Sequence, residues 1–156
     1  MDFSEYVAAR RTSLVRAAVL MGCPQPDAED VVQTALLKCY RSWRRVQRAD
    51  NPDAYVYRAV VNTLASARAR RWTGEVPADQ LPEPDAGEHD LTTGLAIRRA
   101  LATMSKEHRE VLVLRYYADL SERGIAEVLG IPPGTVKSRT ARALAALAGD
   151  HNVRSV

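Results

Sequence analysis

All eight prolines of this chain lie at breaks between longer stretches that repeat apolar residues every three or four positions. A proline inside a helix removes a backbone hydrogen bond and clashes with the preceding turn, so prolines confined to breaks leave the intervening stretches free to be helical. A spacing of three and four is the period of an amphipathic helix. We find no convincing alternation typical of strands. The sequence therefore predicts an all-α protein with three helices, a linker and about four further helices.

The predicted helices have recognisable ends. They begin near residues 3, 26, 52, 90, 106, 122 and 133. The third has the clearest start, because Asn51 is a favourable N-cap and Pro52 suits the first helical position. Ser105 is a second N-cap, and Gly22 ends the first helix. The apolar run 111–114 has the composition of a buried strand, but its charged and aromatic flanks favour a helix.

Charge divides the chain into three parts. Residues 1–72 carry 12 basic and 7 acidic groups, a net charge of +5. Residues 73–94 carry 6 acidic groups and no basic one, a net charge of −6. Residues 95–156 carry 10 basic and 6 acidic groups, a net charge of +4. In the acidic part, the stretch TGEVPADQLPEPDAGEHD, residues 73–90, also contains three prolines and two glycines but few large apolar residues, a composition typical of a flexible linker. We predict two small helical domains, 1–72 and 90–150, joined by a flexible acidic linker over 73–89.

Composition excludes several other classes. Apolar residues make up 46% of the chain, which is enough for a core. Two cysteines form neither a disulfide scaffold nor a zinc site by themselves. No apolar run reaches the length of a membrane span, and the N-terminus lacks a signal-peptide core. We expect a soluble cytoplasmic protein without membrane insertion.

The most specific motif lies near the C-terminus, in DLSERGIAEVLGIPPGTVKSRTARALAAL. Ser121 can cap a short helix, Gly130 can supply the left-handed turn that ends it, and Pro133 can begin a second helix. We expect Val136 and Leu144 of the second helix to be buried. Basic and hydroxyl side chains lie at its front. A short helix, a glycine turn and a basic second helix form a helix-turn-helix, a motif that binds the DNA major groove.

A second segment, RRVQRADNPDAYVYRAVVNTLASARARRW, interleaves basic residues with aromatic ones. Such interleaving suits unpaired bases, which stack on aromatic rings while cations neutralise phosphates. The same residues also fit an ordinary helix with tyrosines in its core. For Asn62, a hydrogen-bonded place inside the helical bundle is the alternative to a contact with DNA.

The acidic start DAEDVVQ at 27–33 is explained by the preference of carboxylates for the positive end of a helix dipole. A paired-carboxylate site is the alternative. The three histidines have no metal-ligand spacing, and the chain lacks a phosphate-binding glycine loop and a nucleophile elbow. We therefore predict no enzyme, no metal and no cofactor.

Together these segments resemble the bacterial RNA polymerase sigma factors of the extracytoplasmic-function (ECF) group. The matching stretches are DAEDVVQTALLKCYRSW, NPDAYVYRAVVNTL with ARARRW, and MSKEHREVLVLRYYADLSERGIAEVLGIPPGTVKSRTARAL. The resemblance covers nearly the whole chain apart from the linker and the last residues. It implies that residues 1–72 are region 2 of a sigma factor and that residues 90–150 are region 4.

The resemblance also implies roles for particular residues. Those expected to bind the clamp helices of the polymerase β′ subunit are Glu29, Asp30 and Gln33. Those expected to bind the −10 promoter element as a single strand, with the loop 47–53, are Asn51, Arg58, Asn62, Arg68 and Arg71. Those expected to bind the −35 element as duplex DNA are Thr135, Lys137, Ser138, Arg139 and Arg142. Further expected partners are the polymerase β flap and an anti-sigma factor.

Some positions depart from the family pattern. Val61 stands where the family often has Arg, and Gly124 occupies the place of a Glu that would complete a capping box with Ser121. We therefore expect a less stable first helix in the helix-turn-helix. A stand-alone helix-turn-helix regulator, binding duplex operators as a dimer, is the main alternative, and a ligand-binding helical protein or enzyme is a third.

Overall fold

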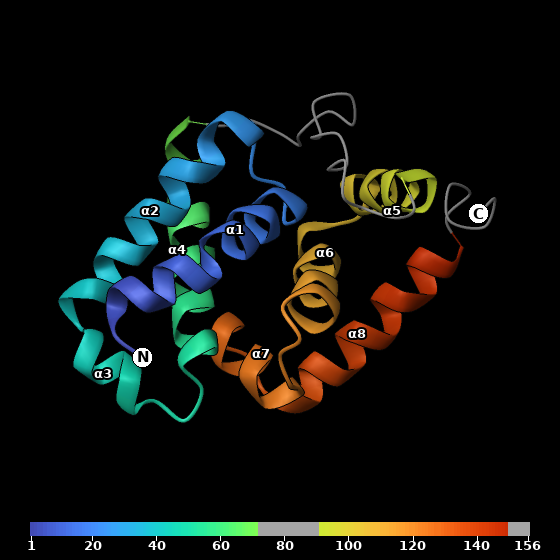
Figure 1. The fold of residues 1–156 in the computed structure, drawn as a ribbon. Coiled ribbons are helices and arrows are strands. Elements are labelled where there is room, and N and C mark those ends of the chain that lie inside the picture. The colour runs from blue at the N-terminus through green and yellow to red at the C-terminus, as the bar shows by residue number, and fades with distance from the viewer. Residues whose placement is uncertain (72–90, 150–156) are drawn as a thin grey trace.

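The computed structural model describes residues 1–71 and 91–149, with the side chains of residues 71 and 91–94 left undescribed. Every regular element in these ranges is helical (Figure 1), so the prediction of an all-α fold is confirmed. The elements are α1 (Phe3–Leu20), α2 (Gln25–Arg41), α3 (Trp43–Arg48), α4 (Pro52–Arg71), α5 (Leu91–Thr103), α6 (Lys106–Leu112), the π-helix η2 (Val113–Tyr117), α7 (Glu122–Leu129) and α8 (Pro133–Ala148). The predicted linker at 73–89 lies outside the described residues.

Helices α1, α2 and α4 pack together and bury an apolar stripe from each. Gly22 makes the tight turn between α1 and α2, with a φ of 103° that a residue with a Cβ rarely adopts. A Cβ there would also lie 2.4 Å from the guanidinium of Arg68. The Tyr6 hydroxyl donates to Asp53 Oδ1 at 2.8 Å and so links α1 to the start of α4. These contacts join α1 to α2 and to α4, the two helices that form the grooves described below.

Helix α3 was not predicted. The sequence from Pro26 to Trp43 reads as one helix, but the backbone leaves helical geometry at Ser42, with φ −123° and ψ 31°. A short helix then carries the chain to Ala49. The start of α4 follows the prediction, because Asn51 Oδ1 accepts a hydrogen bond from the Ala54 amide at 3.1 Å.

The run 111–114 is helical, as its flanks indicated, and its four side chains are buried. Ser105 caps α6 by accepting a hydrogen bond from the His108 amide. The π-helix at 113–117 was not predicted. It is a single wider turn, after which Asp119 adopts a φ of 59°. This turn redirects the chain toward α7.

The helix-turn-helix forms as expected. Ser121 Oγ accepts a hydrogen bond from the Gly124 amide at 3.0 Å, Gly130 takes the left-handed conformation at φ 67°, and α8 begins at Pro133. Val136 is fully buried, but Leu144 is 39% exposed, so that part of the burial prediction was wrong. The inward face of α8 runs through the buried residues 136 and 143 and the partly buried Leu147, and Leu144 lies about 60–100° away from these residues around the helix.

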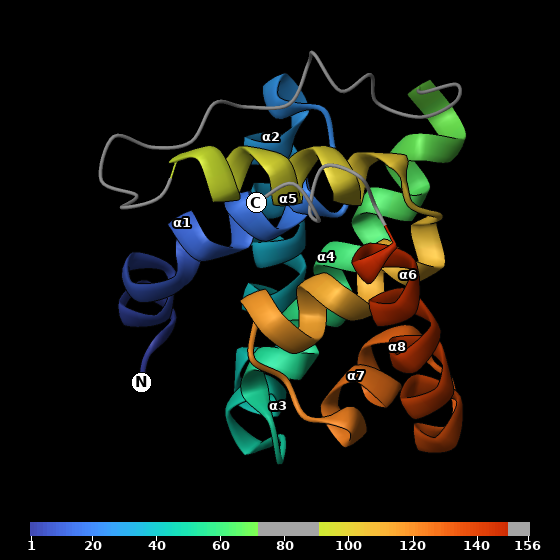
Figure 2. The same cartoon turned by 90° about the vertical axis from the view of Figure 1, so that its right-hand side faces the viewer.

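The two halves of the chain contact each other. Helix α7 lies against α4, and α1 contacts both α5 and η2 (Figures 1 and 2). The ideal Cβ position at Gly124 of α7 is 3.3 Å from Asn51 Nδ2, so the backbone of α7 lies close to the Asn51 side chain. Burial raises the pKa of Tyr57 in α4 to about 12, and the neighbouring Tyr117 of η2 adds to the rise. Buried apolar residues of both halves form one continuous core cluster.

Within the described ranges, no helix is both long enough and apolar enough to cross a membrane.

Candidate functional site

The first part of α2 presents the predicted polymerase-binding residues to solvent. Glu29, Asp30 and Gln33 are all exposed. Asp30 and Gln33 line a cavity of about 330 Å³ between α2 and α4, which also contains Leu37, with 54% of its surface exposed. Arg11 of α1 forms an ion pair with Glu29, so part of the negative charge is already balanced. The structure thus brings the three predicted residues onto one polar face beside an exposed leucine.

Further along the same two helices lies a second cavity, of about 320 Å³. Its lining residues are Lys38, Cys39, Tyr55, Arg58, Ala59 and Asn62. Arg58 and Asn62 lie one turn apart on α4, and both are exposed. Asn62 is therefore not the enclosed, hydrogen-bonded group considered as its alternative. We call this hollow the α2–α4 cavity.

The α2–α4 cavity combines groups that suit an unpaired base. Asn62 carries an amide that can both donate and accept, Tyr55 offers an aromatic ring, and Arg58 supplies a positive charge. Lys38 Nζ donates a hydrogen bond to Thr63 Oγ1 at 3.3 Å, which holds its stem along the groove. The Cys39 thiol is buried, and burial raises its pKa to about 11, so it contributes a neutral, apolar wall.

Two other predicted −10 residues lie on a different side of α4. Asn51 caps the helix and approaches Gly124 of α7. Arg68 is half-buried, and its Nη2 donates to the Met21 carbonyl at 2.6 Å. Burial lowers the pKa of Arg68, while Glu110 of α6 and Cys23 act in the opposite direction.

The five predicted −10 residues are therefore not brought together. Arg58 and Asn62 share the cavity, whereas Asn51 approaches Gly124 and Arg68 interacts with Glu110, both in the other half of the chain. The side chain of Arg71 lies outside the described residues.

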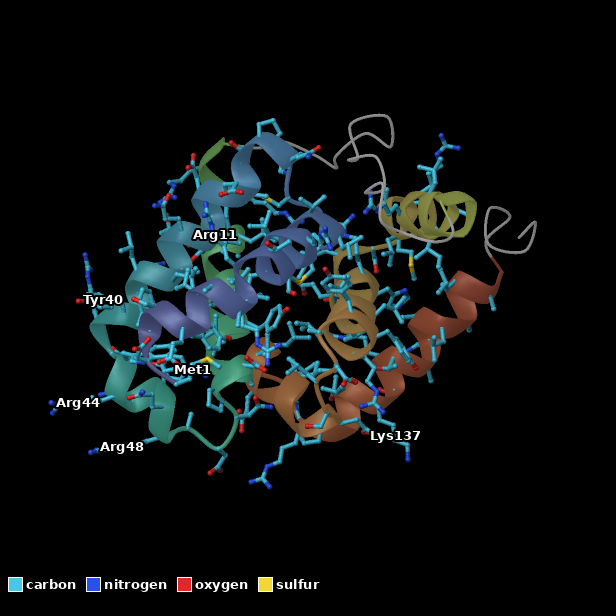
Figure 3. The ribbon with its side chains drawn as sticks, in the orientation of Figure 1. Met1, Arg11, Tyr40, Arg44, Arg48 and Lys137 are labelled. Carbon is cyan, nitrogen blue, oxygen red and sulfur yellow. The ribbon has the colours of Figure 1, made fainter. Side chains whose placement is uncertain are left out.

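The front of α8 places most of its predicted residues in solvent. Lys137, Ser138 and Arg142 are exposed, and Lys137 projects outward in Figure 3. Arg142 Nη2 donates to Ser138 Oγ at 3.3 Å. Arg139 is less accessible, since only 20% of its side chain is exposed and its Nη2 lies 4.0 Å from Glu107 Oε2 of α6. Thr135 is half-buried.

One basic surface was not recognised from the sequence as a surface, although Arg44, Arg45 and Arg48 stand in the second segment described above. Tyr40, Arg41, Arg44, Arg45 and Arg48 are all exposed at the junction of α2 and α3, and we call this set the arginine corner. Figure 3 shows Tyr40, Arg44 and Arg48 pointing away from the ribbon. A signal was present: residues 31–49 contain five basic residues and no acidic one. It was hidden because charge was summed over the whole first domain.

Across the described residues, no three or more His, Cys, Asp or Glu side chains gather in a group able to hold a metal ion.

Described elements that are all helical, a groove of exposed polar groups between two N-terminal helices and a basic helix-turn-helix together define a DNA-binding class of transcription protein. Comparisons with known proteins specify the class. The family model for Sigma-70 region 2 matches residues 6–73, and that for Sigma-70 region 4 matches residues 94–147.

Similar proteins carry the same two regions. The RNA polymerase sigma-E factor of Streptomyces coelicolor is 37% identical over 150 residues, covering 94% of this chain and 84% of the relative. The ECF RNA polymerase sigma factor SigL of Mycobacterium tuberculosis is 36% identical over 142 residues, which cover 86% of this chain and 80% of SigL.

Among solved structures, CnrH in complex with the cytosolic domain of CnrY is 26% identical, with a TM-score of 0.67. The match covers 94% of this chain and 84% of the CnrH chain. The sigma factor RpoE of Bartonella quintana, solved with the anti-sigma factor NepR, has the same fold, with a TM-score of 0.80, 24% identity and 94% coverage of each chain. The chain belongs to the ECF sigma factors of bacterial RNA polymerase.

Proposed function

We propose that this chain binds core RNA polymerase and directs it to promoters, with no catalytic activity of its own and in the cytoplasm. The observation that supports this most directly is the α2–α4 cavity in a chain of this family. It opens beside an acidic helix start, and together these surfaces suit a basic protein partner at one end and a nucleic acid at the other.

Each surface then has a partner. The exposed face with Asp30 and Gln33 would bind the clamp helices of the β′ subunit. The α2–α4 cavity, with Arg58 and Asn62, would hold an unpaired base of the −10 element. The front of α8 would enter the major groove at the −35 element, with Lys137 on phosphate and Arg139 on a base edge. Region 4 would also contact the β flap.

An anti-sigma factor is a further proposed partner. Both solved relatives described above were determined with a second protein, CnrY in one case and the anti-sigma factor NepR in the other. A protein that covers the acidic face of α2 would prevent binding to the polymerase.

The alternative of a stand-alone dimeric regulator is not favoured. A helix-turn-helix alone would be consistent with such a regulator. The other half of the chain matches Sigma-70 region 2 over residues 6–73. A dimeric repressor does not require such a region, so the match favours a sigma factor.

In vitro transcription tests the proposal. The chain is added to core polymerase on genomic fragments, and the transcript starts are mapped. We expect specific starts that share −10 and −35 sequences, together with co-elution of the chain and the core enzyme. Arg139→Ala should remove discrimination at one −35 base pair, measured with single-base variants of a mapped promoter. Absence of co-elution, with binding to duplex DNA by the chain alone, would support the dimeric regulator instead.

A further inference from the structure

The loop that joins α3 to α4 is held at both ends by the beginning of α1. Residues 49–51 separate the two helices. On the α3 side, Gln47 Nε2 donates a hydrogen bond to the Met1 carbonyl at 2.8 Å. On the α4 side, Asp53 Oδ1 accepts one from the Tyr6 hydroxyl at 2.8 Å. The partners are 46 and 47 positions apart in the sequence, so tertiary packing rather than a local turn fixes both ends of the loop.

The bond between Tyr6 and Asp53 is sheltered and charge-assisted. Tyr6 is only 5% exposed. Burial raises the pKa of the Tyr6 hydroxyl well above its ordinary value, and Asp53 adds to the rise, so the hydroxyl keeps its proton and remains a donor. Arg10 Nη2 lies 3.5 Å from the other carboxylate oxygen, Asp53 Oδ2. A hydrogen bond to an ionised acceptor is about twice as strong as a neutral one, so α1 restrains Asp53 strongly.

Aromatic packing holds α3 from the same helix. The Phe3 ring meets the Trp43 ring edge to face with a centroid distance of 5.3 Å, and the Tyr6 ring meets it at the same distance. Trp43 is the first residue of α3, which has only six residues. Isolated helices shorter than about 12 residues are marginal in water, so α3 depends on such contacts for its position. We call Met1, Phe3, Tyr6 and Arg10 the α1 clamp.

The α1 clamp belongs entirely to the N-terminal half of the chain. The approach of Asn51 to Gly124 of α7, by contrast, crosses to the other half and is lost if the two halves separate. Asp50 of the loop and the preceding Arg48 are exposed, so the clamp leaves one side of the loop open to a ligand. The clamp can therefore support the loop while that side contacts DNA.

We propose that the α1 clamp positions the loop for the −10 element: Tyr6, acting through Asp53, holds residues 47–53 in the shape that binds an unpaired strand. This inference rests on the proposed function, because residues 47–53 are part of the surface expected to bind that element. A loop that is ordered before it binds loses less conformational entropy on binding, so its affinity is higher. Tyr6 is too deeply buried to touch DNA, which makes it a positioning residue.

Binding of a fluorescent single strand that carries a mapped −10 element, by the complex of the chain with core polymerase, tests the inference. Tyr6→Phe removes the hydroxyl and keeps the ring. If the loop then has its binding shape in about one molecule in ten, the apparent affinity for the strand should fall about tenfold. Tyr57→Phe removes the hydroxyl of an equally buried tyrosine outside the clamp and should bind the strand as wild type does.

Asp53 provides a test whose sign differs between positioning and mere proximity to DNA. A carboxylate that only lies near phosphates repels them, so its removal in Asp53→Ala would raise the affinity for the strand. Positioning predicts the opposite, a loss close to that of Tyr6→Phe. Asp53→Asn keeps an oxygen that can accept from the Tyr6 hydroxyl and should restore most of the affinity. Since Tyr6 acts through Asp53, the double variant Tyr6→Phe/Asp53→Ala should lose no more than Asp53→Ala alone.

Two further affinities distinguish positioning from a general loss of structure. Tyr6→Phe should keep the wild-type affinity for core polymerase and for a −35 duplex, because the surfaces proposed for these partners lie at the start of α2 and on α8. Urea unfolding confirms that each variant is folded. Equal losses of all three affinities would overturn the inference, because the hydroxyl would then serve only the stability of the fold.

The remaining outcomes separate the two proposals. If the wild-type complex fails to bind the −10 strand, the proposed function is wrong. If wild type binds the strand and Tyr6→Phe binds it equally well, or if Asp53→Ala binds it more tightly, the α1 clamp does not position the loop.

Discussion

Asp30 and Glu29 are neighbours in sequence but differ in their surroundings. Glu29 is paired with Arg11, whereas Asp30 is exposed beside Gln33 and Leu37 and forms no ion pair with a described residue. We expect Asp30→Lys to weaken association with core polymerase by about tenfold or more, because a like charge then faces a basic partner. The dissociation constant for labelled core enzyme measures this. Glu5→Lys reverses the charge of an exposed residue on α1 and should bind core polymerase as wild type does. An equal loss of affinity in Glu5→Lys would mean that the effect of Asp30→Lys comes from the overall charge of the chain.

The two cysteines should behave as protected, neutral thiols. Burial raises the pKa of Cys39 to about 11 and that of Cys23 to about 12. A thiol reacts as its thiolate, so both should resist iodoacetamide at pH 8 in the native chain and react quickly after unfolding. Since both pKa values are raised on folding, their contribution to stability is complete below about pH 9 and is lost as pH rises through 11–12. Mass spectrometry after timed alkylation checks this, and rapid native labelling of Cys39 would contradict its burial.

At the scale of elements, two nearby glycines should respond to alanine with opposite signs. Gly130 ends α7 at φ 67°, and a Cβ there would meet no atom within 4 Å. Gly130→Ala should therefore cost about 1 kcal/mol through backbone strain alone. Gly134 lies in the first turn of α8, also with open space, so Gly134→Ala should stabilise the chain by up to about 1 kcal/mol. Urea unfolding of both variants measures the two values; a loss for both would mean that Gly134 serves another purpose.

Sequence patterns predicted the elements whose ends are set locally. The caps at Asn51, Ser105 and Ser121 and the glycine stop at Gly130 depend on a few adjacent residues, and all four form as expected. The break at Ser42 and the π-turn at 113–117 depend on packing between distant helices, which leaves no local signal.

The same distinction applies to the candidate site. A shared helix face placed Arg58 beside Asn62, because spacing along one helix is fixed by sequence. Arg68 could not be placed in this way, since its partners are the turn at Met21 and, from the other half of the chain, Glu110. The shape of the arginine corner could not be predicted in this way either, because it depends on the break at Ser42 and on the short helix α3.

At the scale of the whole molecule, the contact between α7 and α4 conflicts with simultaneous binding of both promoter elements. The −10 and −35 elements lie about 25 base pairs apart, or roughly 85 Å along the duplex. The 19 residues at 72–90 can span at most about 65 Å when fully extended. The linker alone is shorter than the distance between the two elements, so the two halves must lie at its opposite ends to reach both, and we expect them to separate when the chain engages a promoter.

Gly124 should control that separation. Its ideal Cβ position is 3.3 Å from Asn51 Nδ2, so a long side chain there would push α7 away from α4. We expect Gly124→Glu to increase the distance between fluorophores on the two halves of the free chain, while the carboxylate completes the capping box with Ser121. Gly134→Glu, which adds the same side chain where it meets nothing, is the control. An unchanged distance in Gly124→Glu would show that the contact tolerates the side chain.

The electrostatic interaction between Arg68 of α4 and Glu110 of α6, which joins the two halves, has a thermodynamic consequence. Arg68 lies close to Glu110, so its environment depends on whether the halves are together. A ligand that binds only separated halves has its apparent affinity reduced by the fraction of molecules that are separated. If that fraction is about one in a hundred, the free chain binds a two-element promoter about a hundredfold more weakly than its contacts allow. Polymerase that holds the halves apart would then raise promoter affinity without adding a single contact to DNA.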